Sequence, residues 1–412
     1  MTHQGNRRRV WIVSELYFPE LTSTGYFLTG IAEGLAEEFD VGVLCGQPSY
    51  LLRGVRAPVR EFVNNVDVHR CWATTFDKNK LFCKLINAVT ASASFFLASL
   101  FQIRRGDIVI AVTNPPPLPY LVALACRFRG ASFVLLVHDV YPDVLVRLHM
   151  LSQRSRMAWL INRASKWLYG QAAHILVLGR DMQDLIRSKL ATRHQRVIIA
   201  TNWADVRAIV PRQTATNSLL EKLGLQDRFV VQYCGNIGRT HGIKDIVDAA
   251  ELLVPLPSFH FLLIGWGARK QWAIEKKADK NLNNLTILDP LPTKNFCDGL
   301  NACDVAIISF CSGMAGISVP SRMYNVLAAG KPILAVCDET SELASVVREE
   351  NIGWVIPPGR PDLIVSALRE AKDNPDRLLE MSRRARRTAE TKYTIGNVLP
   401  IYRNLIKGLL AN

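Results

Sequence analysis

The chain has 412 residues, which is too long for one ordinary hydrophobic core and favours two domains. Hydrophobic residues make up 49% of it and charged residues 21%, a composition that excludes disordered and fibrous proteins. The formal net charge of +14 favours an anionic partner, although a surplus spread along so long a chain is also typical of a solvated surface.

The nine cysteines are scattered through mostly apolar runs, with no Cys-x-x-Cys pair. This pattern argues against zinc sites and disulfides and favours a reducing compartment. The chain starts with a basic segment, but Glu15, Pro19 and Glu20 interrupt the stretch that follows, which makes it a poor signal-peptide core. We therefore expect a cytoplasmic protein.

Short β-branched runs alternate with longer amphipathic stretches from residue 9 onward, as in parallel strands joined by crossover helices. In the first half, strands are predicted at 10–13, 40–45, 66–71, 107–112, 132–137, 174–178 and 197–200. A polar stretch at 211–217 interrupts the alternation and is predicted to link two domains. Beyond it, strands are predicted at 229–233, 260–264, 285–288, 304–308, 332–336 and 354–356.

These patterns predict an α/β protein with two Rossmann-like, doubly wound domains at residues 1–210 and 211–394. An amphipathic helix within residues 395–412 is expected to return to the first domain. Before it, the run 382–387 places four arginines on one predicted helix, which is more typical of a solvated face than of a binding site.

Ligands of open parallel sheets bind outside the carboxyl ends of the strands, so the loops that follow the strands are where a site is expected. In the first half, the strand 132–137 ends at His138-Asp139, a titratable pair beside Pro142. The loop 15–25, which leads to Gly25 and a helix, is expected at the same edge. A first-domain active site is predicted here, although a strand-end histidine is often purely structural.

The loop 235–242 follows an apolar strand, precedes a helix and reads Gly-Asn-Ile-Gly-Arg-Thr-His-Gly. Its glycines, Gly238 among them, allow the backbone to approach phosphates closely, and Arg239 offers a bidentate fork to a leaving diphosphate. The same residues are consistent with a tight turn that carries a surface arginine, and their chemistry alone leaves both interpretations open.

A third segment, 316–330, leads through Pro320 into a helix that ends at Gly330. Polar side chains around its start are predicted to hold a ribose and a diphosphate: Ser318, Ser321, Arg322 and Asn325. For Ser321, helix capping is the alternative role.

Motifs of other nucleotide-binding proteins are incomplete. Lys270 stands where Gly265-Trp266-Gly267 would need a third glycine, and Gly330-Lys331 lacks the upstream glycine of a P-loop. Dehydrogenase, kinase and ATPase chemistry is therefore disfavoured. Because no Asp-x-Asp pair is present to hold a divalent ion, arginine and helix dipoles are expected to replace a metal.

In these motifs the chain resembles glycosyltransferase family 4, the retaining enzymes with the GT-B fold, over nearly its whole length. The segments that carry the likeness are Tyr17-Phe18-Pro19-Glu20 with Gly25, His138-Asp139 with Tyr141-Pro142-Asp143, Asn202-Trp203, and Gly235-Asn236-Ile237-Gly238-Arg239. The bacterial transferases of surface-polysaccharide assembly, of the colanic acid and O-antigen type, are especially similar.

The resemblance implies two domains that face each other across a cleft and a metal-independent transfer of a hexosyl or N-acetylhexosaminyl group with retention. The donor would be a nucleotide-diphosphate-sugar, with no other cofactor, and the acceptor a polyprenyl-diphosphate-linked saccharide. Arg239 would neutralise the leaving diphosphate, while His138 and Asp139 would lie near the transferred sugar. Other positions implied to bind substrate are Gly25, Gly238, His241, Ser318, Ser321, Arg322 and Asn325.

Two departures from the family pattern affect the donor site. The two glutamates of the family fall on Ile317 and Asn325, and its usual lysine after the diphosphate-loop arginine falls on His241. The alternatives are a nucleotide-sugar epimerase of similar fold and a non-catalytic nucleotide-sugar-binding subunit. Nucleic-acid binding is disfavoured, because no helix-turn-helix, RNA motif or zinc module accompanies the positive charge.

The segment 85–101 is free of charge and is bracketed by Lys78, Lys80, Lys84, Arg104 and Arg105. Serines, a threonine and an asparagine dilute it, so a helix that lies in the membrane interface fits better than a full crossing. Residues expected to enter the acyl boundary are Phe95, Phe96, Leu100 and Phe101. A crossover helix buried against the sheet fits as well, and the resemblance favours peripheral association with the inner face of the plasma membrane.

Overall fold

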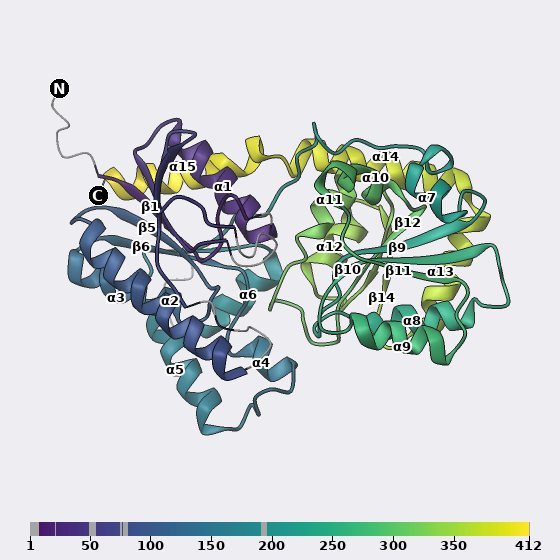
Figure 1. Cartoon of the computed structure of the whole chain (residues 1–412), viewed down its shortest axis with the longest axis horizontal. Coiled ribbons are helices and arrows are strands. Elements are labelled where there is room, and N and C mark those ends of the chain that lie inside the picture. The colour runs from purple at the N-terminus through teal and green to yellow at the C-terminus, as the bar shows by residue number, and fades with distance from the viewer. Residues whose placement is uncertain are drawn as a thin grey trace. The chain divides into compact units, whose positions relative to one another are not determined.

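The computed structural model of the chain describes residues 8–20, 22–48, 55–74, 76, 81–190 and 196–411. The chain divides into two compact units, each an α/β layered structure (Figure 1). The first consists of Met1–Val146, Leu151–Thr201 and Gly396–Asn412, and the second of Arg147–Met150 and Asn202–Ile395. Two doubly wound units were predicted from the alternation of strand and helix patterns, and this prediction is confirmed.

The sheet of the first unit has the order β3-β4-β2-β1-β5-β6-β7-β8. All neighbouring strands are parallel except β3 and β4, which form an antiparallel hairpin at one edge. The strands are β1 (Val10–Val13), β2 (Val41–Cys45), β3 (Arg60–Val63), β4 (Val66–Arg70), β5 (Ile108–Val112), β6 (Ser132–Val137), β7 (His174–Val177) and β8 (Val197–Ile199).

Helices cover both faces of this sheet, with α1 and α15 above it and α2, α3 and α5 below it in Figure 1. Arg403 and Lys407 of α15 pair with Glu38 just after α1, which ties the end of the chain to the first unit. The helices are α1 (Ser23–Ala36), α2 (Leu81–Gln102), α3 (Leu118–Arg129), α4 (Asp143–Arg147), α5 (Arg156–Gln171), α6 (Arg180–Lys189) and α15 (Ile395–Ala411).

The uncharged segment predicted at 85–101 lies within α2, and its burial differs from the expectation. Phe95 is only 1% exposed and packs inside the protein, whereas Phe101 is 82% exposed. Phe96 and Leu100 are half-buried. The predicted basic flank at Lys78 and Lys80 lies outside the described residues, as does the side chain of Lys84. Within the described part of the chain, no helix combines the length and the apolar character needed to cross a bilayer.

The second unit has a six-stranded parallel sheet with the order β11-β10-β9-β12-β13-β14. Its strands are β9 (Phe229–Asn236), β10 (Phe259–Trp266), β11 (Leu285–Leu288), β12 (Val305–Ser309), β13 (Ile333–Val336) and β14 (Gly353–Ile356). Its helices are α7 (Ser218–Leu223), α8 (Ile243–Leu252), α9 (Lys270–Asp279), α10 (Phe296–Asn301), α11 (Arg322–Ala328), α12 (Glu342–Glu349), α13 (Pro361–Asp373) and α14 (Pro375–Lys392).

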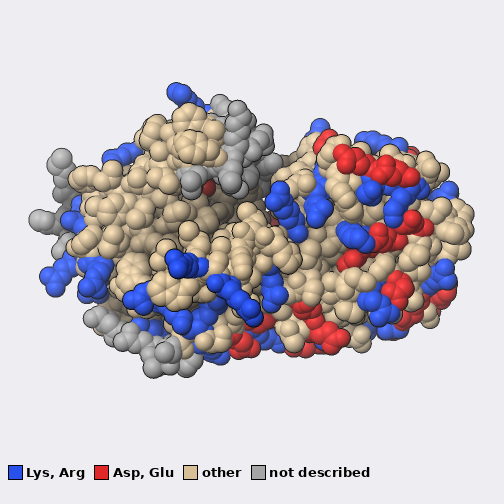
Figure 2. Space-filling view, turned by 90° about the horizontal axis from the view of Figure 1, so that it is seen from below, with Lys and Arg blue, Asp and Glu red and all other residues tan. Residues whose placement is uncertain are grey.

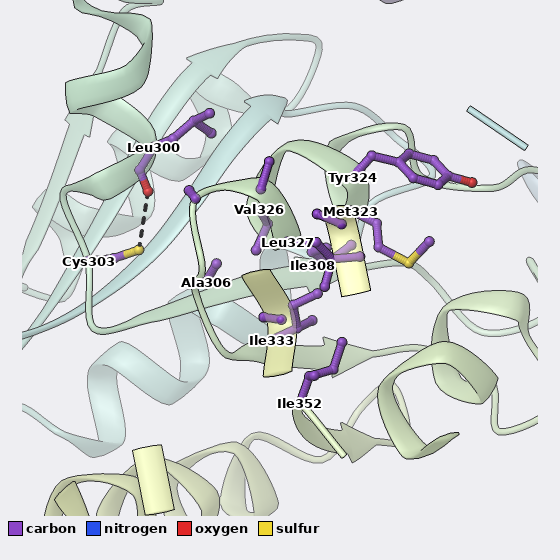
Figure 3. Close-up of a cluster of buried hydrophobic side chains, with 14 of the residues drawn as sticks. Leu300, Cys303, Ala306, Ile308, Met323, Tyr324, Val326, Leu327, Ile333 and Ile352 are labelled. Carbon is purple, nitrogen blue, oxygen red and sulfur yellow. Dashed lines mark hydrogen bonds between the residues drawn. The ribbon is translucent and has the colours of Figure 1, made fainter. Parts of the chain in front are cut away.

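Both faces of this second sheet are buried, which explains its nearly continuous apolar strands. Alternate residues of β12 enter two different cores: Ala306 and Ile308 pack on one side, Val305 and Ile307 on the other. Figure 3 shows the first of these cores, where Leu327 of α11 lies beside Ile308. The packing fixes α11 against the sheet and so determines which of its side chains remain outside the core.

The main segment of the second unit begins at Asn202, whereas the sequence placed the boundary between residues 210 and 211. The segment after Thr201 already belongs to the second core, because Ile209 is buried there. Arg386 of α14 secures this segment by donating to the carbonyl oxygens of Val206, Ile209 and Ala328. Arg386, one of the four arginines predicted to form a solvated face, therefore has a structural role.

Candidate functional site

The carboxyl ends of β9 and β12 flank the point at which the strand order of the second sheet reverses. Loops at such a switch point diverge and leave room for a ligand. Here β9 pairs with β10 along its whole length but with β12 only at Val231 and Gln232. The loop 235–242 and the loop after β12 therefore flank a gap in the sheet edge.

Two facing glycines allow the loop 235–242 to start where it does. Gly235 and Gly265 are paired in the sheet at φ values of +137° and +156°. A Cβ atom built on Gly265 would lie 1.8 Å from the carbonyl oxygen of Gly235, so no other residue fits without a shift of the backbone. The close approach continues the sheet up to Asn236 and Trp266, at the edge where the loop turns.

Arg239 lies in an exposed position of this loop and forms no ion pair with any residue that the structure describes. The backbone amides of Gly238, Arg239 and Thr240 also have no hydrogen-bond partner among the described residues. Carbonyl oxygens of the loop are engaged instead, since the amide of Cys311 donates to Thr240 at 2.9 Å. A free cation and a run of unpaired amides are the groups that bind phosphate oxygens.

Arg239 also lines a pocket of the second unit, together with Arg269 and Trp272. Cys311 and Met314 contribute to the wall of the same pocket. The guanidinium of Arg269 lies 5.6 Å from the ring centroid of Trp272. With Arg147, which also lines it, the pocket combines three arginines with an apolar wall, a lining suited to an anionic group joined to a flat or apolar one.

Arg322, the first residue of α11, places its guanidinium over the ring of Tyr233, 4.4 Å from the centroid. A Cβ atom on Gly235 would lie 3.3 Å from Cζ of this guanidinium. Its Nη1 atom is buried and has no hydrogen-bond partner among the described residues. A buried cationic donor without a partner is costly in free energy, which indicates that this position is suited to bind an anion.

His241 follows in the same loop and is held by two aromatic rings. Its ring stacks on Phe310 at 5.3 Å and lies edge-on to Tyr233 at 6.2 Å. Burial lowers the pKa of His241 well below its ordinary value, and the nearby charge of Arg322 lowers it further. The imidazole is therefore neutral near pH 7, so it does not supply the positive charge of the lysine that the family has at this position.

The remaining predicted donor residues lie around the start of α11. Ser318 and Asn325 are half-buried, on the side of the segment that the core leaves open. Ser321 is in the N-cap position, but its side chain forms no capping hydrogen bond, so the alternative role considered for it is not seen. Asp338 shapes the preceding loop by accepting hydrogen bonds from the amides of Gly313 and Ala315.

In the first unit, the edge at the carboxyl end of β6 carries His138 and Asp139. The hydroxyl of Thr113, just after β5, accepts hydrogen bonds from both of their backbone amides, at 3.1 Å and 3.2 Å. Both side chains are half-buried. Gly25 lies in the first turn of α1, and its amide donates to the N-capping hydroxyl of Thr22 at 3.2 Å, so this amide is already engaged.

Burial lowers the pKa of His138 from 6.5 to about 4. In the unfolded chain this imidazole protonates near pH 6.5, so between these values the folded state binds fewer protons. We therefore predict that the free energy of unfolding is insensitive to this group above pH 6.5. It should fall between pH 6.5 and 4, by about 1.4 kcal/mol for each unit by which the two pKa values differ.

Urea unfolding at a series of pH values measures this dependence, and His138→Gln should make it shallower below pH 6.5. The exposed His149→Gln serves as the control and should leave the slope as it is. An unchanged slope in His138→Gln would contradict the prediction.

Sequence reasoning missed Arg269, Trp272 and Thr113. The first two follow Gly265-Trp266-Gly267, which was tested only as a dinucleotide fingerprint; the basic and aromatic residues just after the glycines were the available signal. Thr113 directly follows an apolar strand next to the switch point of the first sheet, which is a signal of the same kind. Among the described residues, no cluster of three or more His, Cys, Asp or Glu side chains could hold a metal ion.

Two family models match the chain, one in each half. The description "Glycosyl transferase 4-like domain" covers residues 24–203, and "Glycosyl transferases group 1" covers residues 216–388. The chain is 34% identical to the probable glycosyltransferase WbjE of Pseudomonas aeruginosa over 86% of either protein. It is 23% identical to the putative colanic acid biosynthesis glycosyl transferase WcaI of Escherichia coli, over 95% of this chain and 98% of WcaI.

Solved structures agree on the fold. HepE of Anabaena in complex with UDP superposes with a TM-score of 0.72 at 14% identity, covering 97% of this chain and 100% of HepE. Sucrose-phosphate synthase of Thermosynechococcus elongatus gives 0.77 at 15% identity, covering 98% and 100%. The chain therefore belongs to the family 4 glycosyltransferases, with the GT-B type of fold that is built from two parallel-sheet α/β domains.

Proposed function

We propose that this glycosyltransferase moves a sugar from a nucleoside diphosphate to a hydroxyl of a growing saccharide in bacterial surface-polysaccharide synthesis. The observation that carries the proposal is the unpaired Arg239 beside three unengaged amides at the switch point of the second sheet. The name of WcaI, which refers to colanic acid biosynthesis, supports the pathway class. Solved complexes of HepE with UDP and with UDP-glucose support the donor class.

The chemistry follows from where charge develops. As the bond between the sugar and the diphosphate breaks, negative charge grows on the leaving phosphates, and a cation held near them lowers the barrier. Arg239 forms no ion pair with any described residue, and Nη1 of Arg322 is buried without a partner among the described residues, so we assign these two arginines to the diphosphate. We propose that no metal ion takes part and that the two arginines do its work.

Arg322 also accounts for the family lysine that is replaced here by His241. Because His241 is neutral, its ring is suited to accept or donate one hydrogen bond rather than to balance charge. Arg322, whose guanidinium lies over the ring of Tyr233 and acts on His241, supplies the missing positive charge. Asn325 lies one helical turn further along α11 and, with Ser318 and Ser321, is assigned to the ribose and the diphosphate.

We further propose that the reaction proceeds with retention, that His138 and Asp139 lie near the transferred sugar, and that Gly25 lies near the donor. The acceptor is a polyprenyl-diphosphate-linked saccharide, and the enzyme works from the inner face of the plasma membrane as a peripheral protein. These assignments rest on the family resemblance, together with the place of His138 and Asp139 at the carboxyl edge of their sheet.

Binding of UDP- and GDP-sugars, followed by thermal unfolding, tests the proposal. A true donor at 100 times its dissociation constant should stabilise the folded protein by about 2.7 kcal/mol and raise the Tm by several degrees. Nucleotide should then be released only when a saccharide acceptor is added. Conversion of the donor sugar without an acceptor would instead indicate an epimerase, and a panel in which no nucleotide sugar stabilises the protein would refute the proposal.

A further inference from the structure

Helix α2 exposes large apolar side chains and buries several polar ones beside Ala91 and Phe95. The residues that it buries include Asn87, Ser92 and Ser99, and the hydroxyls of both serines have no hydrogen-bond partner among the described residues. The side chains that it exposes include four large apolar ones: Phe82, Val89, Leu97 and Phe101. Water on this side would favour the opposite arrangement, since polar groups are normally outside and apolar groups inside.

The neighbouring helices carry the same kind of surface. Figure 1 shows α2, α3 and α5 side by side on one face of the first sheet, and a hydrogen bond between Tyr120 and Ser165 joins α3 to α5. Phe128 at the end of α3 is 66% exposed and Trp159 of α5 is 64% exposed. We call the exposed side chains of these helices the α2–α3–α5 surface; its further large apolar members are Met157, Leu160 and Trp167.

Basic side chains are interspersed among these apolar ones. Residues 81–180 contain eleven Lys and Arg but only three Asp and Glu, so this stretch holds eight of the fourteen surplus positive charges of the chain. No acidic residue lies within α2, α3 or α5. Figure 2, seen from below, shows blue Lys and Arg side chains among tan ones on this side of the first unit.

The basic residues of this surface are not neutralised locally. Arg127, Arg156, Arg163 and Lys166 are exposed, and within the described part of the chain none of them forms an ion pair. The acid nearest in sequence to Arg104 and Arg105 is Asp107, which is buried and accepts hydrogen bonds from the Trp11 ring and two backbone amides. The surface therefore presents apolar rings and free cations together.

We propose that the α2–α3–α5 surface docks onto a bilayer that contains anionic lipid, with the helices lying on the membrane and not crossing it. Aromatic rings such as Trp159 enter the interface, Leu97 and Phe101 reach the acyl boundary, and Arg163 and Lys166 meet lipid phosphates. The proposal deepens the membrane location proposed above and rests on it, because it names the surface and the lipid chemistry involved.

Charge complementarity selects this occupant over two others. A second copy of the chain docking through the same surface would bring two positive surfaces together, which is unfavourable. A nucleic acid would satisfy the cations but leave Val89, Leu97 and Phe101 in water. An anionic bilayer satisfies both kinds of side chain at once.

Co-sedimentation of the full chain with phosphatidylcholine vesicles, with and without phosphatidylglycerol, tests the proposal. Binding should require phosphatidylglycerol and weaken as salt is added. Two double variants should each lower binding about tenfold or more: Leu97→Gln with Phe101→Gln, and Arg163→Glu with Lys166→Glu. Matched controls with exposed residues of the second unit should bind like the wild type: Leu252→Gln with Leu379→Gln, and Arg383→Glu with Arg387→Glu.

Equal binding to neutral and anionic vesicles, or surface variants that bind as the controls do, would overturn the proposal. So would a concentration-dependent dimer that the surface variants abolish without any lipid binding, because the surface would then belong to a second copy. Donor-induced thermal stabilisation, measured without vesicles, separates this proposal from the transferase chemistry. Surface variants should keep that stabilisation. If the wild-type protein binds vesicles but no nucleotide sugar, the membrane-docking proposal stands and the donor proposal is refuted.

Discussion

Replacing Arg239 by alanine is expected to slow sugar transfer by about 100- to 1,000-fold, the usual effect of removing one donor that stabilises charge in a transition state. Stability should change little, within about 0.5 kcal/mol, because the side chain is exposed and forms no ion pair with any described residue. Steady-state release of nucleotide with saturating acceptor measures the first effect, and urea unfolding measures the second.

Two further variants identify what the guanidinium does. Arg239→Lys keeps a positive charge but loses the bidentate fork, so its rate should fall between those of the wild type and Arg239→Ala. Arg383→Ala removes the same charge from an exposed position of α14 and should leave the rate unchanged. An Arg239→Ala enzyme that transfers sugar at the wild-type rate would remove the residue from the catalytic site.

Much of the fold was predictable because both sheets are buried on both faces. Apolar runs such as β1 and β6 were predicted with their observed bounds, since no amphipathic pattern competes with them. The edge strand β3 was missed because its residues alternate between exposed and half-buried. The signal for it was the turn after β3, where Asn64 and Asn65 both have positive φ, as in a two-residue hairpin loop.

Strand ends and helix faces were less predictable, since tertiary packing decides them. Strand β9 extends beyond the predicted residue 233 because Gly235 packs against Gly265, and no local propensity encodes that contact. The composition of α2 indicated either membrane contact or burial, but which face would be buried depended on α3 and the sheet. Phe95 and Phe101 were grouped together for this reason, although the structure separates them.

The loop 235–242 was recognisable from sequence because glycines and an arginine between a strand and a helix form a local pattern. The place of Arg322 was not, because its environment comes from β9, far away in the chain. Helical periodicity predicts that Arg322 lies on the side of α11 that faces away from the hydrophobic core. Only the folded sheet, however, places the ring of Tyr233 beneath its guanidinium. This long-range contact makes Arg322 the most informative residue to change after Arg239.

Arg322→Met is expected to weaken donor binding by about 10- to 150-fold, which corresponds to the loss of about 1.5–3 kcal/mol for hydrogen bonds to a charged group. The free energy of unfolding of the ligand-free protein should not fall. The change removes a buried donor without a partner, and a methionine keeps an apolar contact with the ring of Tyr233. Isothermal titration with the nucleotide sugar and urea unfolding without it measure the two effects.

Opposite behaviour of stability and binding is what distinguishes a ligand-binding cation from a structural one. If Arg322 held the loop in place, unfolding free energy and donor affinity would fall together in Arg322→Met, and the assignment to the diphosphate would fail. Arg369→Met, on the exposed side of α13, should change neither quantity.

The ring of His241 gives an independent readout of the same assignment. Its pKa should rise in Arg322→Met, because the charge of Arg322 is one cause of its lowering. If an NMR titration of the imidazole gives the same His241 pKa in Arg322→Met as in the wild type, the guanidinium of Arg322 does not act on the charge of this loop.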